Sequence, residues 1–261
     1  MRNWLAQHTL ENPIFDKEMR LRWRRGRLWI VPAITVGCLV VLMLLAASFG
    51  FYEREYWTEA YPVIASVMGY VIAGAAALLI TPALTAGTLA SERQQRTLEM
   101  LMITRVTSWQ IIIGKLVPSL LPVVLAVVPC LCLSTFFALV GSVVDVSRDH
   151  WGYWTQSFLH WLTAPLSAIF AACAAMFFSA ICPNIASATA WGYAVTLGTY
   201  LIAQHGLWFV SVLGLSRVDP SPQNAPEMVG RAAIVWIVFA WLAAAGLFGA
   251  RWRLEREAEL R

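Results

Sequence analysis

The sequence predicts an all-α integral membrane protein with six transmembrane helices. Of its 261 residues, 59% are hydrophobic and 13% are charged, so a soluble fold would expose apolar runs as long as a bilayer. Six runs approach or exceed the roughly 20 residues that cross about 30 Å of hydrocarbon. Each run is continuously apolar rather than alternating, which favours helices over barrel strands. The six runs are residues 28–51, 62–90, 116–144, 158–182, 185–203 and 232–250.

The positions of the lysines and arginines predict the orientation of the chain. Six spans place both termini on one side, and fifteen of the 19 Lys and Arg residues fall on that side. Short cytoplasmic loops carry an excess of these residues. We therefore expect a multi-pass protein of the cytoplasmic (inner) membrane, with cytoplasmic tails at residues 1–27 and 251–261 around a transmembrane domain at residues 28–250. This topology accounts for the net charge of +4 without a nucleic-acid partner, and a basic inner face suits membrane lipid.

An amphipathic helix is expected before the first span. Asn12-Pro13 is typical of a helix start, with Asn as the cap and Pro in the first turn. Asp16 and Glu18 follow near the positive end of the helix dipole and arginines near its negative end, which predicts a helix over residues 13–27. We expect this elbow helix to lie along the inner leaflet; the alternative is a basic flank that only sets orientation. Its interfacial residues are Asn12, Pro13, Lys17, Arg20, Arg24 and Arg27.

A charged segment, residues 91–110, separates the second and third spans. It is too polar for hydrocarbon but carries a small apolar stripe, so we expect a short helix at the membrane surface, followed by a turn at residues 104–106. Ser91 and Gln94 fit a capping box at the start of this helix. The alternative is an inert interfacial loop. The apolar stripe consists of Leu98, Leu101 and Met102.

The third span is expected to begin directly after this segment. Thr107 or Ser108 can cap its helix, and Trp109 follows at headgroup depth. Lys115 is then expected to reach back toward the headgroups by snorkelling.

The chain carries a series of short motifs around the elbow helix and in the charged segment. They are Asn12-Pro13, Ser91-Glu92-Arg93, Arg96-Thr97-Leu98-Glu99-x-Leu101, Thr104, Ser108-x-Gln110-Ile111 and Gly114-Lys115. With the layout of the spans, which covers almost the whole chain, these motifs resemble the membrane subunits of the type 2 family of ATP-binding cassette (ABC) exporters. Family members tend to have Gly at the position of Arg96, and Thr-Pro where this chain has Thr104-Arg105.

The resemblance implies a coupling helix that docks on a soluble ABC ATPase (nucleotide-binding) subunit. It also implies a second permease subunit, as a homodimer or heterodimer, and ATP and Mg²⁺ bound by the partner ATPase. Gly114-Lys115 lacks the upstream Gly of a phosphate-binding loop, so we expect a transport subunit without its own ATP site and with no catalytic, cofactor-binding or metal-binding residues. The coupling residues implied here are Glu92, Arg93, Arg96, Leu98, Glu99, Leu101, Met102 and Arg105.

Two other functional classes are weighed against this interpretation. An ion-coupled secondary transporter or channel usually buries ionisable residues near the midplane, whereas the central thirds of all six runs lack Asp, Glu, Lys and Arg. A membrane-embedded enzyme would need His, Asp or Glu clustered at one depth, and no such set occurs. The polar residues of the spans are assigned to helix packing and backbone repair rather than to a substrate site. They include Thr81, Thr85, Ser179, Ser187 and Thr189.

Two local patterns predict how the spans pack. Small residues recur every four positions at Gly69, Ala73 and Ala77, and again at Gly246 and Ala250, which indicates close helix contacts. The apolar residues 207–215 are about half the length needed to cross, which is typical of a re-entrant hairpin before the sixth span.

Overall fold

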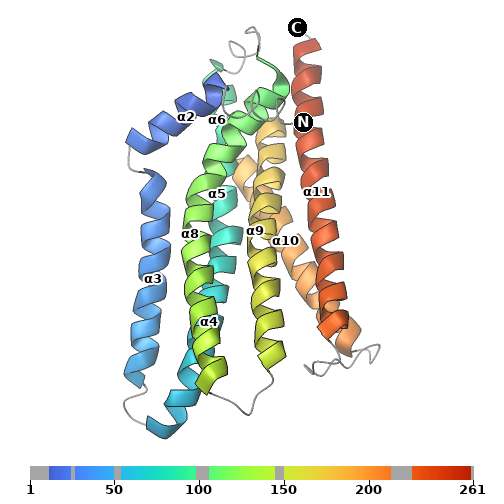
Figure 1. The fold of residues 1–261 in the computed structure, drawn as a ribbon. Coiled ribbons are helices and arrows are strands. Elements are labelled where there is room, and N and C mark those ends of the chain that lie inside the picture. The colour runs from blue at the N-terminus through green and yellow to red at the C-terminus, as the bar shows by residue number, and fades with distance from the viewer. Residues whose placement is uncertain are drawn as a thin grey trace.

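The computed structural model describes residues 12–24, 27–49, 54–97, 106–144, 150–212 and 225–259, and nearly all of them are helical (Figure 1). No strand occurs in these ranges, so the predicted all-α class is confirmed for the described residues. The elements are α2 (Pro13–Arg24), α3 (Arg27–Phe49), α4 (Arg54–Ala75), the π-helix η1 (Ala76–Ile80), α5 (Thr81–Thr85), α6 (Gly87–Gln94), α8 (Ser108–Val144), α9 (His150–Ile181), α10 (Ile185–Val212) and α11 (Ala225–Glu259).

Five helical segments of the described chain are long and apolar enough to cross a membrane. The fifth predicted run, residues 185–203, is not among them, because Gly, Thr, Trp and Tyr dilute its apolar residues. It nevertheless forms α10, which runs along the bundle beside α9 (Figure 1). As a result, α2 and the last turns of α11 lie at the same end of the molecule. The five segments are Leu28–Leu45, Ile64–Gln94, Ser108–Val140, Trp161–Ile181 and Trp236–Arg256.

The predicted re-entrant hairpin is not present in the part of residues 207–215 that the structure describes. Helix α10 continues without a break to Val212, so residues 207–212 are its last turns. No proline interrupts residues 204–206, and a single Gly does not end a helix that has packing partners. Residues 213–215 lie outside the described residues. The last helix is also longer than the predicted span 232–250, since α11 extends over 35 residues.

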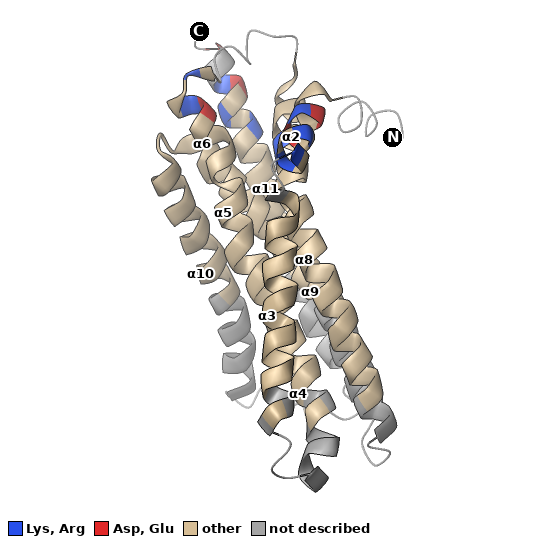
Figure 2. Ribbon diagram, turned by 90° about the vertical axis from the view of Figure 1, so that its left-hand side faces the viewer, with Lys and Arg blue, Asp and Glu red and all other residues tan. Residues whose placement is uncertain are grey.

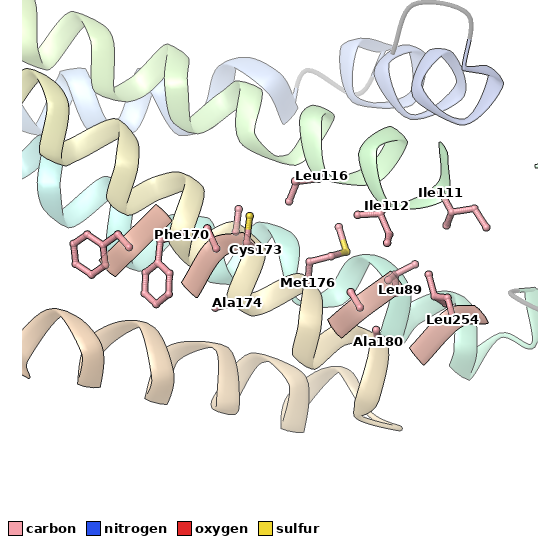
Figure 3. Packing of buried hydrophobic residues seen from close by; sticks show 14 residues of the cluster. Leu89, Ile111, Ile112, Leu116, Phe170, Cys173, Ala174, Met176, Ala180 and Leu254 are labelled. Carbon is pink, nitrogen blue, oxygen red and sulfur yellow. The ribbon is translucent and has the colours of Figure 1, made fainter. Parts of the chain in front are cut away.

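Helix α9 is the centre of the bundle. Of its membrane-crossing segment 67% is buried, against 28% for α3 and 22% for α11. Figure 3 shows Phe170, Cys173 and Met176 of α9 within a cluster that also contains Leu89 of α6 and Ile112 of α8. All three α9 side chains are at most 2% exposed. A change in the position of α9 would therefore alter its packing against most of the neighbouring helices.

The predicted small-residue contacts are confirmed as packing within this chain. A Cβ atom added to Gly69 of α4 would lie 1.8 Å from Ser134 Oγ of α8, so these two helices touch along the small face. Ala73 and Ala77 on the same face are fully buried. A Cβ at Gly246 of α11 would lie 3.1 Å from the carbonyl oxygen of Cys173, which explains the close approach of α11 to α9.

The second predicted span is helical but interrupted. Pro82 lacks a backbone N–H, and the chain before it widens into the π-helix η1. Thr85 donates its hydroxyl hydrogen to the carbonyl oxygen of Thr81 at 2.8 Å, and Tyr193 of α10 donates to the carbonyl oxygen of Leu79. The predicted role of Thr85 in backbone repair is therefore confirmed. A further turn at Ala86 separates α5 from α6.

Candidate coupling site at the basic end of the bundle

Charged side chains gather at one end of the molecule. Every Lys, Arg, Asp and Glu whose side chain the structure describes lies there, on α2, α6, the turn after α6, the first turns of α8 or the last turns of α11 (Figure 2). We call this region the basic end. Charged side chains are energetically unfavourable in hydrocarbon, so the basic end marks the level at which the bundle leaves the apolar layer.

Asn12 starts the elbow helix and fastens it to α8. Its Oδ1 accepts a hydrogen bond from the backbone N–H of Ile14 at 3.0 Å, which confirms the predicted cap. Its Nδ2 donates to the carbonyl oxygen of Gln110 at 2.6 Å, so one buried side chain joins two segments 98 residues apart. The cap is thus also a docking contact.

The elbow helix lies against the first turns of α8 because that face of α8 carries a glycine. A Cβ at Gly114 would come within 2.9 Å of Asn12 Nδ2 and 3.1 Å of Ile14 Cβ. Further along, Arg22 Nη2 donates to Ser119 Oγ at 3.1 Å. These contacts place α2 across the start of α8 (Figure 1).

The other predicted elbow residues point outward or lie at the helix boundary. Lys17, Arg20 and Arg24 are exposed, and Arg20 pairs with Asp16 at 2.6 Å one turn away. The described part of the elbow helix reaches Arg24, Arg27 belongs to α3, and residues 25 and 26 lie outside the described residues. The exposed basic face is the amphipathic pattern that an interfacial helix needs.

Lys115 does not snorkel. Its side chain is only 3% exposed, and its Nζ lies 2.7 Å from Glu92 Oε1 and 3.5 Å from Glu18 Oε1. The ammonium also donates to the carbonyl oxygen of Thr88 at 3.4 Å. The expectation was wrong because carboxylates from α6 and α2 offer the buried ammonium closer partners than the headgroup layer does. We call Glu18, Glu92 and Lys115 the ion-pair triad.

The triad joins three elements through one charge. Glu18 belongs to the elbow helix, Glu92 to α6 and Lys115 to α8. The second carboxylate oxygen of Glu92 is buried and accepts no hydrogen bond from the described residues. The position of Glu92 therefore depends mainly on Lys115, and a shift of α6 would change the contact that the elbow helix shares.

Helix α6 is also tied to the end of α9. Arg93 donates from Nη2 to the carbonyl oxygen of Ala180 at 2.6 Å and from Nη1 to that of Cys182 at 3.4 Å. Carbonyl groups at a helix C-terminus lack intrahelical partners and favour a nearby cation. Arg93, which was predicted as a coupling residue, thus caps α9 within the same chain.

Ser179 of α9 completes this junction. Its Oγ accepts hydrogen bonds from the backbone N–H groups of Leu89 and Ala90 at 3.0 and 2.9 Å. Both donors lie in the first turn of α6, where backbone N–H groups lack an acceptor within their own helix. The predicted packing role of Ser179 is confirmed, but its partners could not be predicted.

The capping box expected at Ser91 and Gln94 is wrong. Ser91 lies inside α6, which begins at Gly87, and its hydroxyl donates to the carbonyl oxygen of Thr88 at 3.3 Å. Residues 91–94, which begin the charged segment and which we call its stem, therefore continue the second span and do not start a new helix. The chain turns at Arg96, whose φ of 56° is in the left-handed region that favours glycine.

Of the eight predicted coupling residues, three lie within the described residues. Glu92 and Arg93 bind α8 and α9 as above, and Arg96 is exposed at the turn. The other five, Leu98, Glu99, Leu101, Met102 and Arg105, lie outside the described residues.

The start of α8 confirms the second predicted cap. The Thr107 backbone N–H donates to Gln110 Oε1 at 2.9 Å, and the Gln110 N–H donates to Thr107 Oγ1 at 3.4 Å, which together form a capping box. Trp109 packs edge-on against Phe248 of α11, with Arg251 5.4 Å above its ring. Trp109 was expected only as an interfacial anchor, so its link to α11 was missed.

The comparison with known families agrees with this geometry. The model of the ABC-2 type transporter family matches residues 12–203, from the cap of the elbow helix to the middle of α10. No curated protein matches the chain. Because the family match covers well over half of the chain, the protein belongs to the ABC-2 type transporter family and is a membrane permease component of an ABC transporter.

Proposed function

We propose that the chain is the transmembrane subunit of an ATP-driven exporter, and that it converts ATP hydrolysis by a separate soluble subunit into substrate movement across the cytoplasmic membrane. The observation that carries this proposal is the ion-pair triad, which joins the stem of the charged segment to the elbow helix through Lys115. ATP and Mg²⁺ are bound by the partner subunit in this scheme.

The proposed coupling is mechanical. A partner that changes shape can move the bundle only through contacts that differ between its two states. Residues 98–105 would form the docking surface, and α6 would carry its displacement, since Glu92 contacts α8 and Arg93 contacts the end of α9. The π-helix η1 and the turn at Ala86 are places where the second span can bend.

The membrane arrangement in this proposal has six crossings and both termini in the cytoplasm. Helix α10 supplies the crossing that its composition alone does not support: 28 residues at about 1.5 Å each extend over roughly 40 Å. The chain then pairs with a second permease subunit, either a copy of itself or a relative. The uncharged interior of the spans favours amphipathic or hydrophobic cargo, such as lipids, glycolipids or drugs.

A pull-down from mild detergent tests the proposal. We expect a soluble ATPase to co-purify with the full chain in equal amount, whereas an ion-driven carrier would be recovered without one. The triple variant Leu98→Asp, Leu101→Asp, Met102→Asp should still insert but should lose the ATPase. Thr97→Asp is the matched control, because it adds a charge at an exposed position beside the stripe. Normal recovery of the ATPase with the triple variant would contradict the docking role.

A further inference from the structure

One buried hydroxyl of the second span has no hydrogen-bond partner within the described residues. Thr81 directly follows the π-helix η1 and is 0% exposed, and its Oγ1 makes no hydrogen bond there. A buried hydroxyl without a bond is destabilising, so Thr81 requires an explanation. Other threonine hydroxyls of the helices donate to the carbonyl oxygen four residues back at 2.7 to 2.9 Å. They belong to Thr35, Thr85, Thr135, Thr189 and Thr196.

The π-helix explains why Thr81 differs from these residues. Backbone hydrogen bonds of an α-helix reach four residues back, whereas those of a π-helix reach five. The wide turn of η1, Ala76–Ile80, therefore holds one residue more than an α-helical turn. It displaces the carbonyl oxygen of Ala77, which is four residues before Thr81. The Thr81 hydroxyl thus loses the acceptor that a threonine in a continuous α-helix uses.

The same turn is held by a donor from another helix. The hydroxyl of Tyr193 in α10 donates to the carbonyl oxygen of Leu79, which lies in η1. The position of Tyr193 is fixed by the contact between α10 and α9, since a Cβ atom at Gly192 would lie only 3.3 Å from that of Ala175. Tyr193 is therefore a donor whose place does not depend on the backbone of the second span.

Helix α5 has irregular backbone at both ends and space beside it. Its five residues lie between η1 and the turn at Ala86. Ala83 and Leu84 of α5 line a cavity of about 290 Å³ that also borders Pro122 of α8. Beyond the turn, α6 is held to α9 by the hydrogen bonds of Ser179. A change in α5 therefore does not require α6 to leave its place.

We propose that the second span has two hydrogen-bond registers, and that the extra residue of η1 moves across α5 into the turn that follows it. In the register of the structure, Tyr193 holds the carbonyl oxygen of Leu79, and the Thr81 hydroxyl is unpaired. In the other register residues 76–85 are α-helical, Thr81 donates to the carbonyl oxygen of Ala77, and Tyr193 releases Leu79. Helix α5 then turns by one residue, about 100°, beside the cavity. This inference does not depend on the proposed exporter function.

Fluorine NMR of the full chain in detergent, labelled with 3-fluorotyrosine, tests the two registers. The signal of Tyr193 is identified by its loss in Tyr193→Phe. Thr81→Val removes the donor on which the second register depends, so the ratio of the released to the bonded form of Tyr193 should fall about tenfold and its signal should change accordingly. Thr81→Ser keeps the hydroxyl and should preserve the original signal. An unchanged signal in Thr81→Val, or the same change in both variants, overturns the proposal. Thr35→Val removes a threonine donor from α3 and should have no effect.

Deletion of Ala76 tests the extra residue separately. If η1 holds one residue more than an α-helix needs, this deletion makes the second span regular and leaves α4 and α6 in place, so the chain should still elute as a folded species in size-exclusion chromatography. Only one register then remains, and adding Thr81→Val should no longer change the Tyr193 signal. Deletion of Val124, which is 45% exposed in the continuous helix α8, is the matched control. It should prevent folding, because it turns all later residues of α8 by about 100°. Equal recovery of the two deletion variants, whether high or low, overturns the proposal.

Discussion

The two helix junctions at the basic end are built from different chemistry. The elbow helix is joined to α8 by side chains of opposite charge and by the buried amide of Asn12. Helix α6 is joined to α9 by contacts with backbone groups, since Arg93 binds carbonyl oxygens and Ser179 binds N–H groups. The first junction therefore depends on a balance of charge, and the second depends on where two helices are interrupted.

This difference indicates which junction is suited to move. Hydrogen bonds to buried backbone groups leave an unsatisfied donor or acceptor when they break, so the α6–α9 junction should resist separation. Ion pairs can exchange partners, and Lys115 already contacts two carboxylates. We infer that α6 and α9 move as a unit, and that the change occurs where this unit meets α8 and the elbow helix.

Removing the shared cation should have the largest effect. In Lys115→Met the carboxylates of Glu92 and Glu18 lose their buried partner, and we expect a loss of about 3 kcal/mol in the free energy of unfolding. The double variant Lys115→Met, Glu92→Gln should recover much of this loss, because only one uncompensated carboxylate remains. Unfolding in mixed micelles measures both. A single variant as stable as the unmodified chain would show that the triad is not buried.

The backbone junction is tested by Ser179→Ala. The N–H groups of Leu89 and Ala90 lose their common acceptor, and we expect a cost of about 2 kcal/mol in the same assay. Ser187→Ala is the matched control, because Ser187 only donates to the nearby carbonyl oxygen of Asn184 at an exposed site, and it should change stability by less than about 0.5 kcal/mol. Equal effects of the two substitutions would contradict the assigned role of Ser179.

The seat of the elbow helix is tested by Gly114→Ala. The added methyl group meets Asn12 and Ile14, and overpacking of roughly 1–3 kcal/mol is partly offset by the higher helix propensity of alanine, so we expect a net loss of about 1 kcal/mol. The elbow helix should detach more often and be cut faster by trypsin at Lys17. Gly37→Ala adds a methyl group with no neighbour within 4 Å and should not change the cleavage rate. Slow cleavage in both variants would mean that Gly114 does not limit docking.

The contacts behind these predictions differ in how far the sequence reveals them. The caps at Asn12 and Thr107 were predictable because both partners lie within three residues. The Glu92–Lys115 pair spans 23 residues and the Ser179 contacts about 90, and no local pattern records which helix faces meet. The cap predicted at Ser91 was wrong because a polar residue after an apolar run is typical of a helix start, whereas here the helix continues through Ser91.

Helix α10 shows that hydropathy, too, does not predict how far a helix extends. Hydropathy predicted a span that stops at residue 203, because Gln204 and His205 lower the apolar content there. The backbone has no reason to stop at that point, so the helix continues to Val212. Composition locates the apolar layer, whereas helix ends are determined by caps, prolines and glycines.

The smallest expected effect concerns the turn that follows both junctions. Arg96 has a positive φ. Two backbone hydrogen bonds hold the turn in place: the N–H of Gln95 donates to the carbonyl oxygen of Ser91, and the N–H of Arg96 donates to that of Arg93. A residue with a Cβ in the left-handed region is destabilised by roughly 1 kcal/mol relative to glycine. Arg96→Gly should therefore be more stable than Arg96→Ala by up to about 1 kcal/mol, since alanine removes the side chain but keeps the strain.

Resembling exporters tend to have glycine at this position, so the same two variants also test whether the backbone strain matters for coupling. If Arg96→Gly stabilises the chain yet lowers ATPase activity in the complex, the left-handed arginine contributes to the partner contact, whereas equal stability of the two variants would mean that the turn stores no strain.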